Sequence, residues 1–349
     1  MQVLEWKGLF SFMPTWEIFE GDCVEVMKDI APNSIDAIVT DPPAGISFMG
    51  KKWDSDKGGR DQWVTWMSGV ALKCLILLKP GGHALVWALP RTSHWTATAW
   101  EDAGFEIRDC IYHIFGSGFP KGKYNLKPAA ENWWLFRKPL SEKSVADNMK
   151  CWGTGALNIE DCRVPAPEGD RTEYGIDGNE SAGRNRNAYS DHNAKRTPYV
   201  RPDNGRWPAN VVLDEEAGRL LDEQSGVTTS GAMKREVGAY AGESTTKLLR
   251  GKSGPTNQHG DSGGASRFFY CTKASRKERG ENNKHPTVKP LKLMRYLCRL
   301  IAPLGGTILD PFCGSGSTGV AAIDGGFNFI GIDQDPVCVD LTQERIENG

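Results

Sequence analysis

The sequence predicts an α/β protein of the Rossmann-like type, built on an open, largely parallel sheet. Two apolar runs end at an acidic residue, as buried strands do in such sheets: Ile35 to Thr40 stops at Asp41, and a second run stops at Asp310. A glycine-rich loop and a short apolar helix follow Asp310, and a third apolar run ends at Asp333. This unit is typical of nucleotide sites, although tight packing alone also favours glycines.

Length and composition limit the possible architectures. The chain has 349 residues, enough for one sizeable α/β domain with an insertion or a second small domain. A hydrophobic content of 39% supports a real core, whereas 40 glycines and 20 prolines indicate long irregular segments. The formal net charge of -2 lacks the basic signature of many nucleic-acid binders, so any DNA-binding surface must be a local patch.

The cysteines favour a reducing compartment. Nine scattered cysteines without a Cys-x-x-Cys pair, together with six dispersed histidines, predict neither a zinc site nor a disulfide framework, and no metal is expected. No basic N-terminal region precedes an apolar run, and no stretch approaches the length of a membrane span. We therefore expect a soluble, cytoplasmic protein with no membrane partner.

The N-terminal part is expected to alternate between strands and helices. Its predicted elements are a strand at 16–19, a helix at 24–30, a strand at 35–40, a helix at 63–78, a strand at 83–89, a helix at 93–102, and strands at 105–115 and 132–137. Pro42 and Pro43 cannot donate backbone hydrogen bonds, so the third of these elements must stop before them. Asp41 is thereby presented at the carboxyl end of a strand, where open α/β sheets hold their ligands.

The C-terminal part begins with an amphipathic helix that leads into the glycine loop. One stripe of this helix carries Leu291, Met294, Leu297, Cys298 and Ile301. The loop reads Asp-Pro-Phe-x-Gly-x-Gly, and Gly314 and Gly316 let a ligand approach the backbone closely. It matches neither the Gly-x-Gly-x-x-Gly loop of dehydrogenases nor a P-loop, which requires Gly-Lys-Ser/Thr. Asp333, about twenty residues after the loop, is placed to hydrogen-bond ribose hydroxyls.

These motifs resemble those of a known enzyme family. Asp-Pro-Phe-x-Gly-x-Gly is similar to the S-adenosylmethionine (AdoMet) loop of DNA amino-methyltransferases, and the motifs Asp41-Pro42-Pro43 and His285-Pro286-Thr287-Val288-Lys289-Pro290 lie upstream of it. This order resembles the β-class N6-adenine/N4-cytosine family of bacteria and phages, in which the catalytic half precedes the AdoMet half. The resemblance covers roughly residues 16–140 and 284–347. It implies a circularly permuted, Rossmann-like, seven-stranded methyltransferase sheet with an inserted target-recognition region.

The resemblance also implies a division into three parts. They are the catalytic half at 1–139, a partly irregular target-recognition insert at 140–283, and the AdoMet-binding half at 284–349. Within the insert, hydrophobic periodicity largely disappears, and only 152–159 and 205–212 look ordered. Its cations are expected to form either a phosphate-facing patch or a solvated surface: Arg184, Arg186, Lys195, Arg196, Arg201, Arg206, Arg267, Lys273, Arg276, Lys277 and Arg279.

The resemblance gives the catalytic role to Asp41, Pro42 and Pro43. An exocyclic amine is a poor nucleophile, and accepting hydrogen bonds from both its hydrogens favours a pyramidal nitrogen whose lone pair can face the sulfonium methyl. The Asp41 carboxylate and the Pro42 carbonyl, held by the rigid Pro-Pro turn, would be the two acceptors, and orientation would contribute up to about 7–11 kcal/mol. Methylation at cytosine C5 is excluded, because the chain has no Pro-Cys nucleophile.

For the cofactor AdoMet, the resemblance assigns further residues. Asp310 and Asp333 would bind its amino-acid and ribose ends, and Asp22 would accept from its adenine amino group. Thr287 and Lys289 would lie near the methionine end. The full expected set is Asp22, Cys23, Thr287, Lys289, Asp310, Phe312, Cys313, Gly314, Gly316 and Asp333.

One motif position departs from the family. The fourth residue after the strand, usually Tyr, Phe or Trp, is Ala44, so the stacking platform for an extruded base is missing. Stacking contributes about 1–3 kcal/mol, and we hypothesise that Phe48 or Trp53 substitutes for it. The alternatives are that both side chains belong to an ordinary loop, or that Ala44 marks an unusual enzyme. The segment 116–127, with its glycines, aromatics and lysines, is expected either to contact DNA or to be a plain connection.

The predicted function is site-specific DNA methylation on an exocyclic amine. Asp at the first motif position favours adenine N6, because Ser is commoner there in the cytosine enzymes. Cytosine N4 methylation, RNA amino-methylation and a non-catalytic nucleic-acid-binding relative are the alternatives. We expect double-stranded DNA as the partner, and the resemblance allows a homodimer and a role in restriction-modification or in a phage.

Overall fold

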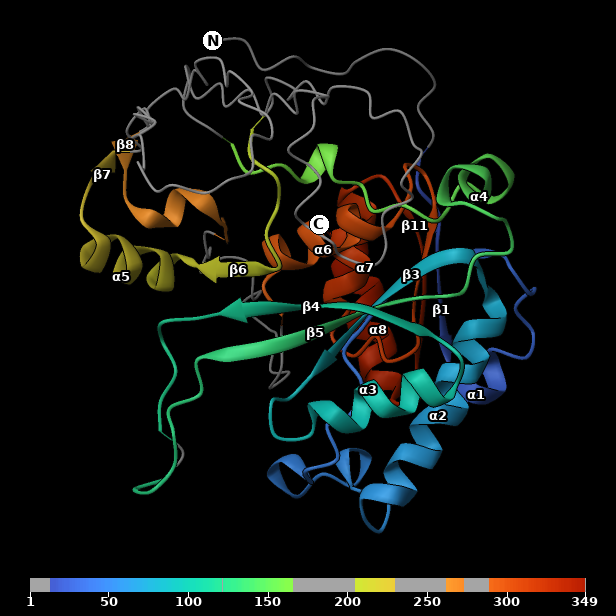
Figure 1. Ribbon diagram of the computed structural model, residues 1–349. Coiled ribbons are helices and arrows are strands. Elements are labelled where there is room, and N and C mark those ends of the chain that lie inside the picture. The colour runs from blue at the N-terminus through green and yellow to red at the C-terminus, as the bar shows by residue number, and fades with distance from the viewer. Residues whose placement is uncertain (1–12, 121, 166–204, 230–261, 273–288, 349) are drawn as a thin grey trace, which may run out of the picture.

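One mixed sheet organises the part of the chain that the structure describes. The computed structural model describes residues 13–120, 122–165, 205–229, 262–272 and 289–348 (Figure 1). Nine strands pair in the order β1-β11-β10-β2-β3-β5-β4-β6-β9. They are β1 (Trp16–Glu20), β2 (Ile35–Thr40), β3 (Leu78–Ala88), β4 (Glu106–Ile114), β5 (Ala130–Arg137), β6 (Val211–Asp214), β9 (Tyr270–Thr272), β10 (Thr307–Asp310) and β11 (Asn328–Asp333). The predicted α/β fold class is confirmed.

The order of the strands brings the two ends of the chain together. β10 pairs in parallel with both β11 and β2, and the register places Ile308 beside Ala37. β1 runs parallel to β11 at one edge, and β5 runs antiparallel to both β3 and β4. Because the carboxyl ends of parallel neighbours meet at the same edge, the residues that follow β2 and β10 lie side by side.

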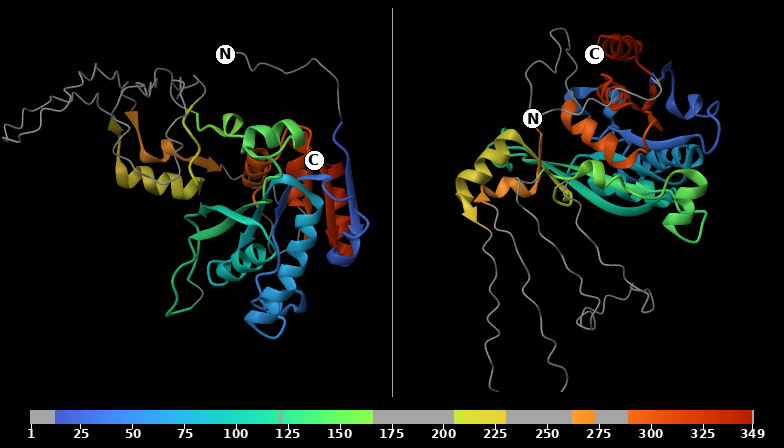
Figure 2. Two further views of the ribbon diagram at one scale, coloured as in Figure 1. Left: turned by 45° about the vertical axis from the view of Figure 1, so that its right-hand side comes forward. Right: turned by 90° about the horizontal axis from the view of Figure 1, so that it is seen from above.

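Helices cover both faces of the sheet (Figures 1 and 2). On one face lie α1 (Cys23–Val26), α2 (Arg60–Leu77) and α3 (Ser93–Asp102), and on the other α6 (Leu291–Ile301), α7 (Ser317–Asp324) and α8 (Pro336–Glu347). Side chains of β2 alternate between the two cores, with Ala37 and Val39 facing α6 and Ile38 facing α2. The chain is therefore wound on both sides of a buried sheet.

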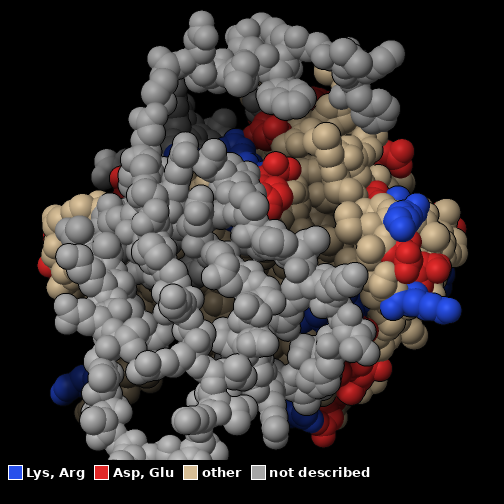
Figure 3. All heavy atoms as spheres, turned by 45° about the horizontal axis from the view of Figure 1, so that its top comes forward, with Lys and Arg blue, Asp and Glu red and all other residues tan. Residues whose placement is uncertain are grey.

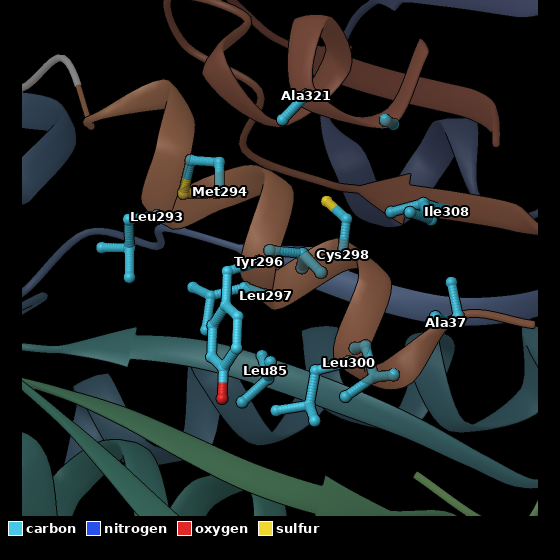
Figure 4. Packing of buried hydrophobic residues seen from close by; sticks show 14 of the residues in the cluster. Ala37, Leu85, Leu293, Met294, Tyr296, Leu297, Cys298, Leu300, Ile308 and Ala321 are labelled. Atoms are coloured by element: carbon cyan, nitrogen blue, oxygen red, sulfur yellow. The ribbon is translucent and has the colours of Figure 1, made fainter. Parts of the chain in front are cut away.

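The stripe predicted for α6 forms the centre of one core. Leu291, Met294, Leu297, Cys298 and Ile301 are all buried, and Figure 4 shows α6 packed against the strands that carry Ala37, Leu85 and Ile308. Each fully buried leucine contributes roughly 1.5–3 kcal/mol by leaving water. This packing fixes the segment before α6, including Lys289, over the carboxyl edge of the sheet.

Residues 140–283 add to the sheet beyond the seven strands expected. β6 pairs in parallel with β4, and β9 pairs in parallel with β6. The described parts of this segment also contain α4 (Val145–Trp152), α5 (Glu215–Ser225), two 3-10 turns at Glu160–Cys162 and Ala265–Phe268, and the short antiparallel pair β7 (Thr228–Thr229) and β8 (Ser262–Gly263). Figure 2 shows α5 and its neighbours at the end of the sheet away from β1. The segment thus extends the sheet at its β4 edge.

Of the cations predicted for this segment, only two lie within the described residues. Arg206 is buried, and its guanidinium donates to the carbonyl of Arg267 at 2.8 Å. Arg267 in turn donates to the carbonyls of Gly263 and Gly264, each at 2.7 Å. Both arginines therefore tie the segment together. Arg184, Arg186, Lys195, Arg196, Arg201, Lys273, Arg276, Lys277 and Arg279 lie outside the described residues.

The predicted element boundaries hold with a few exceptions. The first helix is a single turn that ends at Val26 instead of reaching Ile30, and β3 begins at Leu78, five residues before the predicted start. α4, α5 and α8 were not predicted. Among the helices of the described residues, none has both the length and the apolarity that a membrane crossing needs.

A pair of glycine substitutions tests how tightly α8 packs on the glycine loop. Gly305 and Gly316 have positive φ of 71° and 74°, but an added Cβ meets nothing within 4 Å at Gly305 and lies 2.8 Å from Thr342 at Gly316. We expect Gly305→Ala to cost about 1–2 kcal/mol from the left-handed backbone. Gly316→Ala should cost roughly 1–3 kcal/mol more from overpacking.

Urea denaturation of the two variants and the wild type measures this difference. Equal losses of unfolding free energy in the two variants would contradict the tight packing of Thr342 on the loop.

Candidate active site

The carboxyl ends of β2 and β10 meet at a buried carboxylate. Asp310, which ends β10, is 1% exposed, and its Oδ1 accepts from the Thr40 hydroxyl at 2.7 Å and from the Phe312 backbone amide at 3.1 Å. Its Oδ2 accepts from the Thr318 hydroxyl on α7 at 2.6 Å. Burial raises the pKa of Asp310 to about 7, against the lowering effect of these donors. The structure therefore places Asp310 beneath the glycine loop, joining β2, β10 and α7.

The glycine loop is anchored to its surroundings by backbone contacts. Gly314 donates its amide to Asp333 Oδ2 at 2.8 Å, and its carbonyl accepts from the Thr342 hydroxyl of α8 at 3.1 Å. Cys313 donates its amide to the Ile332 carbonyl at 3.0 Å. The Cys313 thiol is 5% exposed, and burial raises its pKa far above the ordinary value. Cys313 is thus a packing residue, and Asp333 holds the loop in place.

The first helix turn lies next to this loop. Gly21 donates its amide to the Asp333 carbonyl at 2.9 Å, and Asp22 caps α1 by accepting from the Val24 and Glu25 amides at 2.9 and 3.3 Å. Cys23 is 8% exposed, and burial raises its pKa to about 12. The structure therefore gathers Asp22, Cys23, Cys313, Gly314 and Asp333, five residues of the set expected for the cofactor.

This gathering suits a nucleoside ligand. Asp22 is exposed and Asp333 is half-buried, and Gly314 keeps part of its backbone accessible at a φ of 52°, whereas Gly316 is buried against Thr342. Carboxylates accept hydrogen bonds from the hydroxyl and amino groups that a nucleoside offers. The chemistry of these residues fits the adenosyl part of AdoMet.

Asp41 lies beside Asp310 and faces a lysine. Lys289 Nζ is 3.3 Å from Asp41 Oδ2, and the side chains of Asp41 and Lys289 are 22% and 10% exposed. Burial raises the pKa of Asp41 to about 6, while Lys289 opposes the rise. The sequence predicted that Lys289 lies near the methionine end of the cofactor. In the structure its ammonium group lies beside the carboxylate of Asp41, the predicted catalytic residue. Thr287 lies outside the described residues.

Three residues near Asp41 were not anticipated. Lys289 Nζ lies 3.8 Å from Glu131 Oε2 at the start of β5 and 3.8 Å from the ring centroid of Trp87 on β3. Glu131 Oε2 also lies 3.8 Å from His113 Nδ1 on β4. Burial alone would raise the pKa of Glu131, but Lys289 and His113 outweigh it and lower this pKa to about 2. An acidic residue within an otherwise apolar and aromatic strand is the signal that could have identified Glu131.

The loop after Asp41 is built around a second buried carboxylate. Asp54 is 1% exposed and accepts from the backbone amides of Gly45, Ile46 and Phe48 at 2.9, 3.3 and 2.8 Å. The carbonyl of Ala44 accepts from the Thr92 hydroxyl at 2.9 Å. These contacts fix the start of the loop, so Ala44 is held on both sides.

Aromatic side chains surround this loop and the cofactor motif. Phe312 packs edge-on against Trp66 with ring centroids 6.0 Å apart, and Trp63 lies near both Trp66 and Trp95. Trp53 is 37% exposed, whereas Phe48 is half-buried. Within the described ranges, no three His, Cys, Asp or Glu side chains are grouped as a metal site would require.

Replacement of Asp54 tests its hold on the loop. Asp54→Asn keeps one acceptor oxygen and loses the charge that three amides share, so we expect a loss of about 2–3 kcal/mol in unfolding free energy. Hydrogen exchange at Gly45, Ile46 and Phe48 should accelerate. Asp56→Asn is the matched control, because the carboxylate of exposed Asp56 accepts from the Gly58 amide at 3.1 Å, outside the three amides that Asp54 holds. Unchanged exchange at all three amides in Asp54→Asn would contradict this role.

Comparisons with known proteins find several similar chains. Over 83 residues, the chain is 39% identical to the type II methyltransferase M.BglI of Bacillus subtilis, covering 24% of this chain and 23% of that protein. Over 64 residues, it is 44% identical to the type II methyltransferase M2.DpnII of Streptococcus pneumoniae, covering 18% and 24%. The matched segments thus span about a quarter of these relatives. The crystal structure of an M1.HpyAVI–SAM complex is similar over 95% of this chain and 99% of that one, with 19% identity and a TM-score of 0.47.

A family profile gives the broadest match. The profile described as DNA methylase, of the N6/N4 type, matches residues 35–344 and so includes Asp41, Lys289 and the whole glycine loop. Members of this family use AdoMet as the methyl donor. The resemblance seen in the motifs is confirmed, and the chain belongs to the N6/N4 DNA methylase family.

Proposed function

We propose that the protein transfers a methyl group from AdoMet to an exocyclic amino group of a base in DNA. The observation that carries this proposal is the position of Asp41, at the strand end next to the glycine loop and in a partly buried site. Family membership across residues 35–344 supports the reaction class. Adenine N6 is the proposed target, because Asp stands at the first position of the Asp-Pro-Pro motif.

The chain's own residues supply acceptors and orientation. The Asp41 carboxylate and the Pro42 carbonyl accept the two amino hydrogens, and Pro43 keeps the turn rigid. An ionised carboxylate accepts hydrogen bonds at both oxygens, whereas a protonated one presents an O–H donor. Lys289 favours the ionised form of Asp41 from 3.3 Å. Fixed acceptors of this kind act mainly through orientation.

The residues gathered around the glycine loop hold AdoMet in this proposal. The cofactor supplies an electrophilic methyl group carried on a sulfonium. Asp22 and Asp333 accept from its adenine and ribose groups, Gly314 permits close backbone approach, Gly316 forms the turn into α7, and Phe312 packs beside it. Thr287 and Lys289 are proposed for the methionine end, and the buried side chains of Asp310, Cys23 and Cys313 support the proposed cofactor site from within the fold.

DNA contacts are proposed for two parts of the chain. The loop between β4 and β5 extends away from the sheet (Figure 1), and Phe119, Tyr124 and Leu126 on it are 81%, 91% and 93% exposed. Exposed aromatic and apolar side chains can stack on or wedge between bases. Residues 140–283 are proposed to recognise the target sequence, between a catalytic half at 1–139 and a cofactor half at 284–349.

Surface charge supports local rather than global DNA contact. On the face shown in Figure 3, acidic and basic side chains of the described residues lie close together at the right of the view. A mixed surface gives little long-range attraction for a polyanion. Double-stranded DNA is the proposed substrate, and a homodimer acting in the cytoplasm is the proposed state of the protein.

Methyl transfer to unmethylated duplex DNA tests the reaction. With tritiated AdoMet and nucleoside analysis, we expect labelled N6-methyladenine, and a loss of roughly a hundredfold or more in Asp41→Ala because the amine is no longer oriented. Asp56→Ala removes an exposed carboxylate from the following loop and should keep the wild-type rate. Labelled N4-methylcytosine would show that the target base is cytosine instead of adenine. Label found only in RNA, or no label in either nucleic acid, would contradict DNA as the substrate.

Substitutions in the loop after Asp41 test the replacement for the missing aromatic. We propose that Phe48 or Trp53 stacks on the base, so Phe48→Ala or Trp53→Ala should lower kcat/KM for DNA by roughly tenfold, consistent with about 1–3 kcal/mol of stacking. Met49→Ala is the control, because Met49 is 74% exposed in the same loop. If both aromatic variants match the wild type, neither side chain is the platform.

A further inference from the structure

Lys289 places one ammonium group between two carboxylates from different strands. Its Nζ lies 3.3 Å from Asp41 Oδ2 after β2 and 3.8 Å from Glu131 Oε2 on β5. The ring of Trp87 lies beside the same ammonium, with its centroid 3.8 Å away. Because the Lys289 side chain is only 10% exposed, solvent screens these interactions weakly. The two carboxylates therefore compete for one cation.

Glu131 is fixed in this position by the sheet. It lies directly opposite His113 in the register of β4 and β5, and His113 Nδ1 is 3.8 Å from its Oε2. The side chains of His113 and Glu131 are 6% and 26% exposed, so this contact is partly shielded from solvent. Lys289 and His113 hold the pKa of Glu131 at about 2 despite its burial. Glu131 thus presents a constant negative charge to Lys289 throughout the neutral and mildly acidic range.

Asp41 is surrounded by further charged groups. Lys289 before α6 favours its ionised form, whereas Glu131 on β5 and Asp54 in the loop after β2 disfavour it. Asp310 on β10 also interacts electrostatically with Asp41. With burial, the outcome is a pKa of about 6 for Asp41. Asp41, which must accept the amino hydrogens, therefore titrates just below neutrality. The way in which Lys289 is shared between Asp41 and Glu131 affects the ionised fraction of Asp41.

We propose that Glu131 is a positioning residue for methyl transfer, which draws Lys289 partly away from Asp41 and so sets the pH range in which Asp41 is an ionised acceptor. This inference rests on the proposed function and gives a role to a residue outside the Asp-Pro-Pro and cofactor motifs. A merely structural role for Glu131 would affect stability without moving the titration of Asp41. The two roles are therefore separable by experiment.

Two substitutions should shift Asp41 in opposite directions. Glu131→Gln removes a repelling charge and leaves Lys289 to Asp41, so the pKa of Asp41 should fall by roughly one unit. Lys289→Met removes the attracting charge, so the pKa of Asp41 should rise by roughly one unit. The rate of each protein at pH 5 is expressed as a fraction of its own plateau rate. This fraction should be roughly fivefold higher in Glu131→Gln than in the wild type, and roughly tenfold lower in Lys289→Met.

The titration can be followed without cofactor or DNA. Carboxyl ¹³C NMR of the aspartate-labelled, ligand-free protein reports the ionisation of Asp41, whose signal is identified by its absence in Asp41→Asn. The pH profile of methyl transfer under single-turnover conditions then shows whether the acid limb follows the same order. Glu106→Gln is the matched control, because Glu106 bonds Arg137 at 2.6 Å across the same two strands, away from Asp41.

The outcomes separate this inference from the proposed function. Opposite shifts of both the NMR titration and the acid limb, with Glu106→Gln unchanged, are expected. If Asp41 titrates at the same pH in Glu131→Gln and in the wild type, the inference is overturned. It is also overturned if the titration of Asp41 shifts but the acid limb of the methyl-transfer profile does not. Shifted NMR titrations in a protein that methylates no substrate overturn the proposed function, while the link between Glu131, Lys289 and Asp41 stands.

Discussion

The buried carboxylate of Asp310 is the contact on which the rest of the site depends. It receives hydrogen bonds from Thr40, which is 270 residues away in the sequence, and from Thr318 on the helix after the glycine loop. Burying a carboxylate is costly unless such donors surround it, and each bond to a charged group contributes about 1.5–3 kcal/mol. One side chain therefore fixes the end of β2, the loop and α7 relative to one another.

The same packing concentrates negative charge at one edge of the sheet. Parallel pairing of β2 and β10 places Asp41 near Asp310, and burial raises the pKa of both carboxyl groups. Lys289, held by the packing of α6, supplies the opposite charge at this edge. The electrostatic surroundings of Asp41 therefore depend on hydrophobic packing as much as on its neighbours in the sequence.

The sequence predicted those features that local patterns determine. Alternation of apolar runs, the Asp-Pro-Pro stop and the glycine loop were enough to locate β2, α6, β10 and β11 and the carboxylates at their ends. Glu131, His113 and Trp87 were missed because they meet only through the order β3-β5-β4, which no local pattern encodes. Asp54 was missed for a related reason. Its carboxylate accepts from three backbone amides, and these contacts belong to no sequence motif.

The position of β10 in the sheet also has a consequence for synthesis of the chain. Within the described residues, β1 pairs with β11 alone, and the outer edge of β2 is completed only by β10. Both partners follow β2 only after residues 41–306 of the chain, so two strand edges stay open while that stretch is synthesised. Contacts of such long sequence separation favour slow folding. The nascent protein therefore completes its sheet in one late step, and the edges of β1 and β2 are where chaperones or aggregation would act before that step.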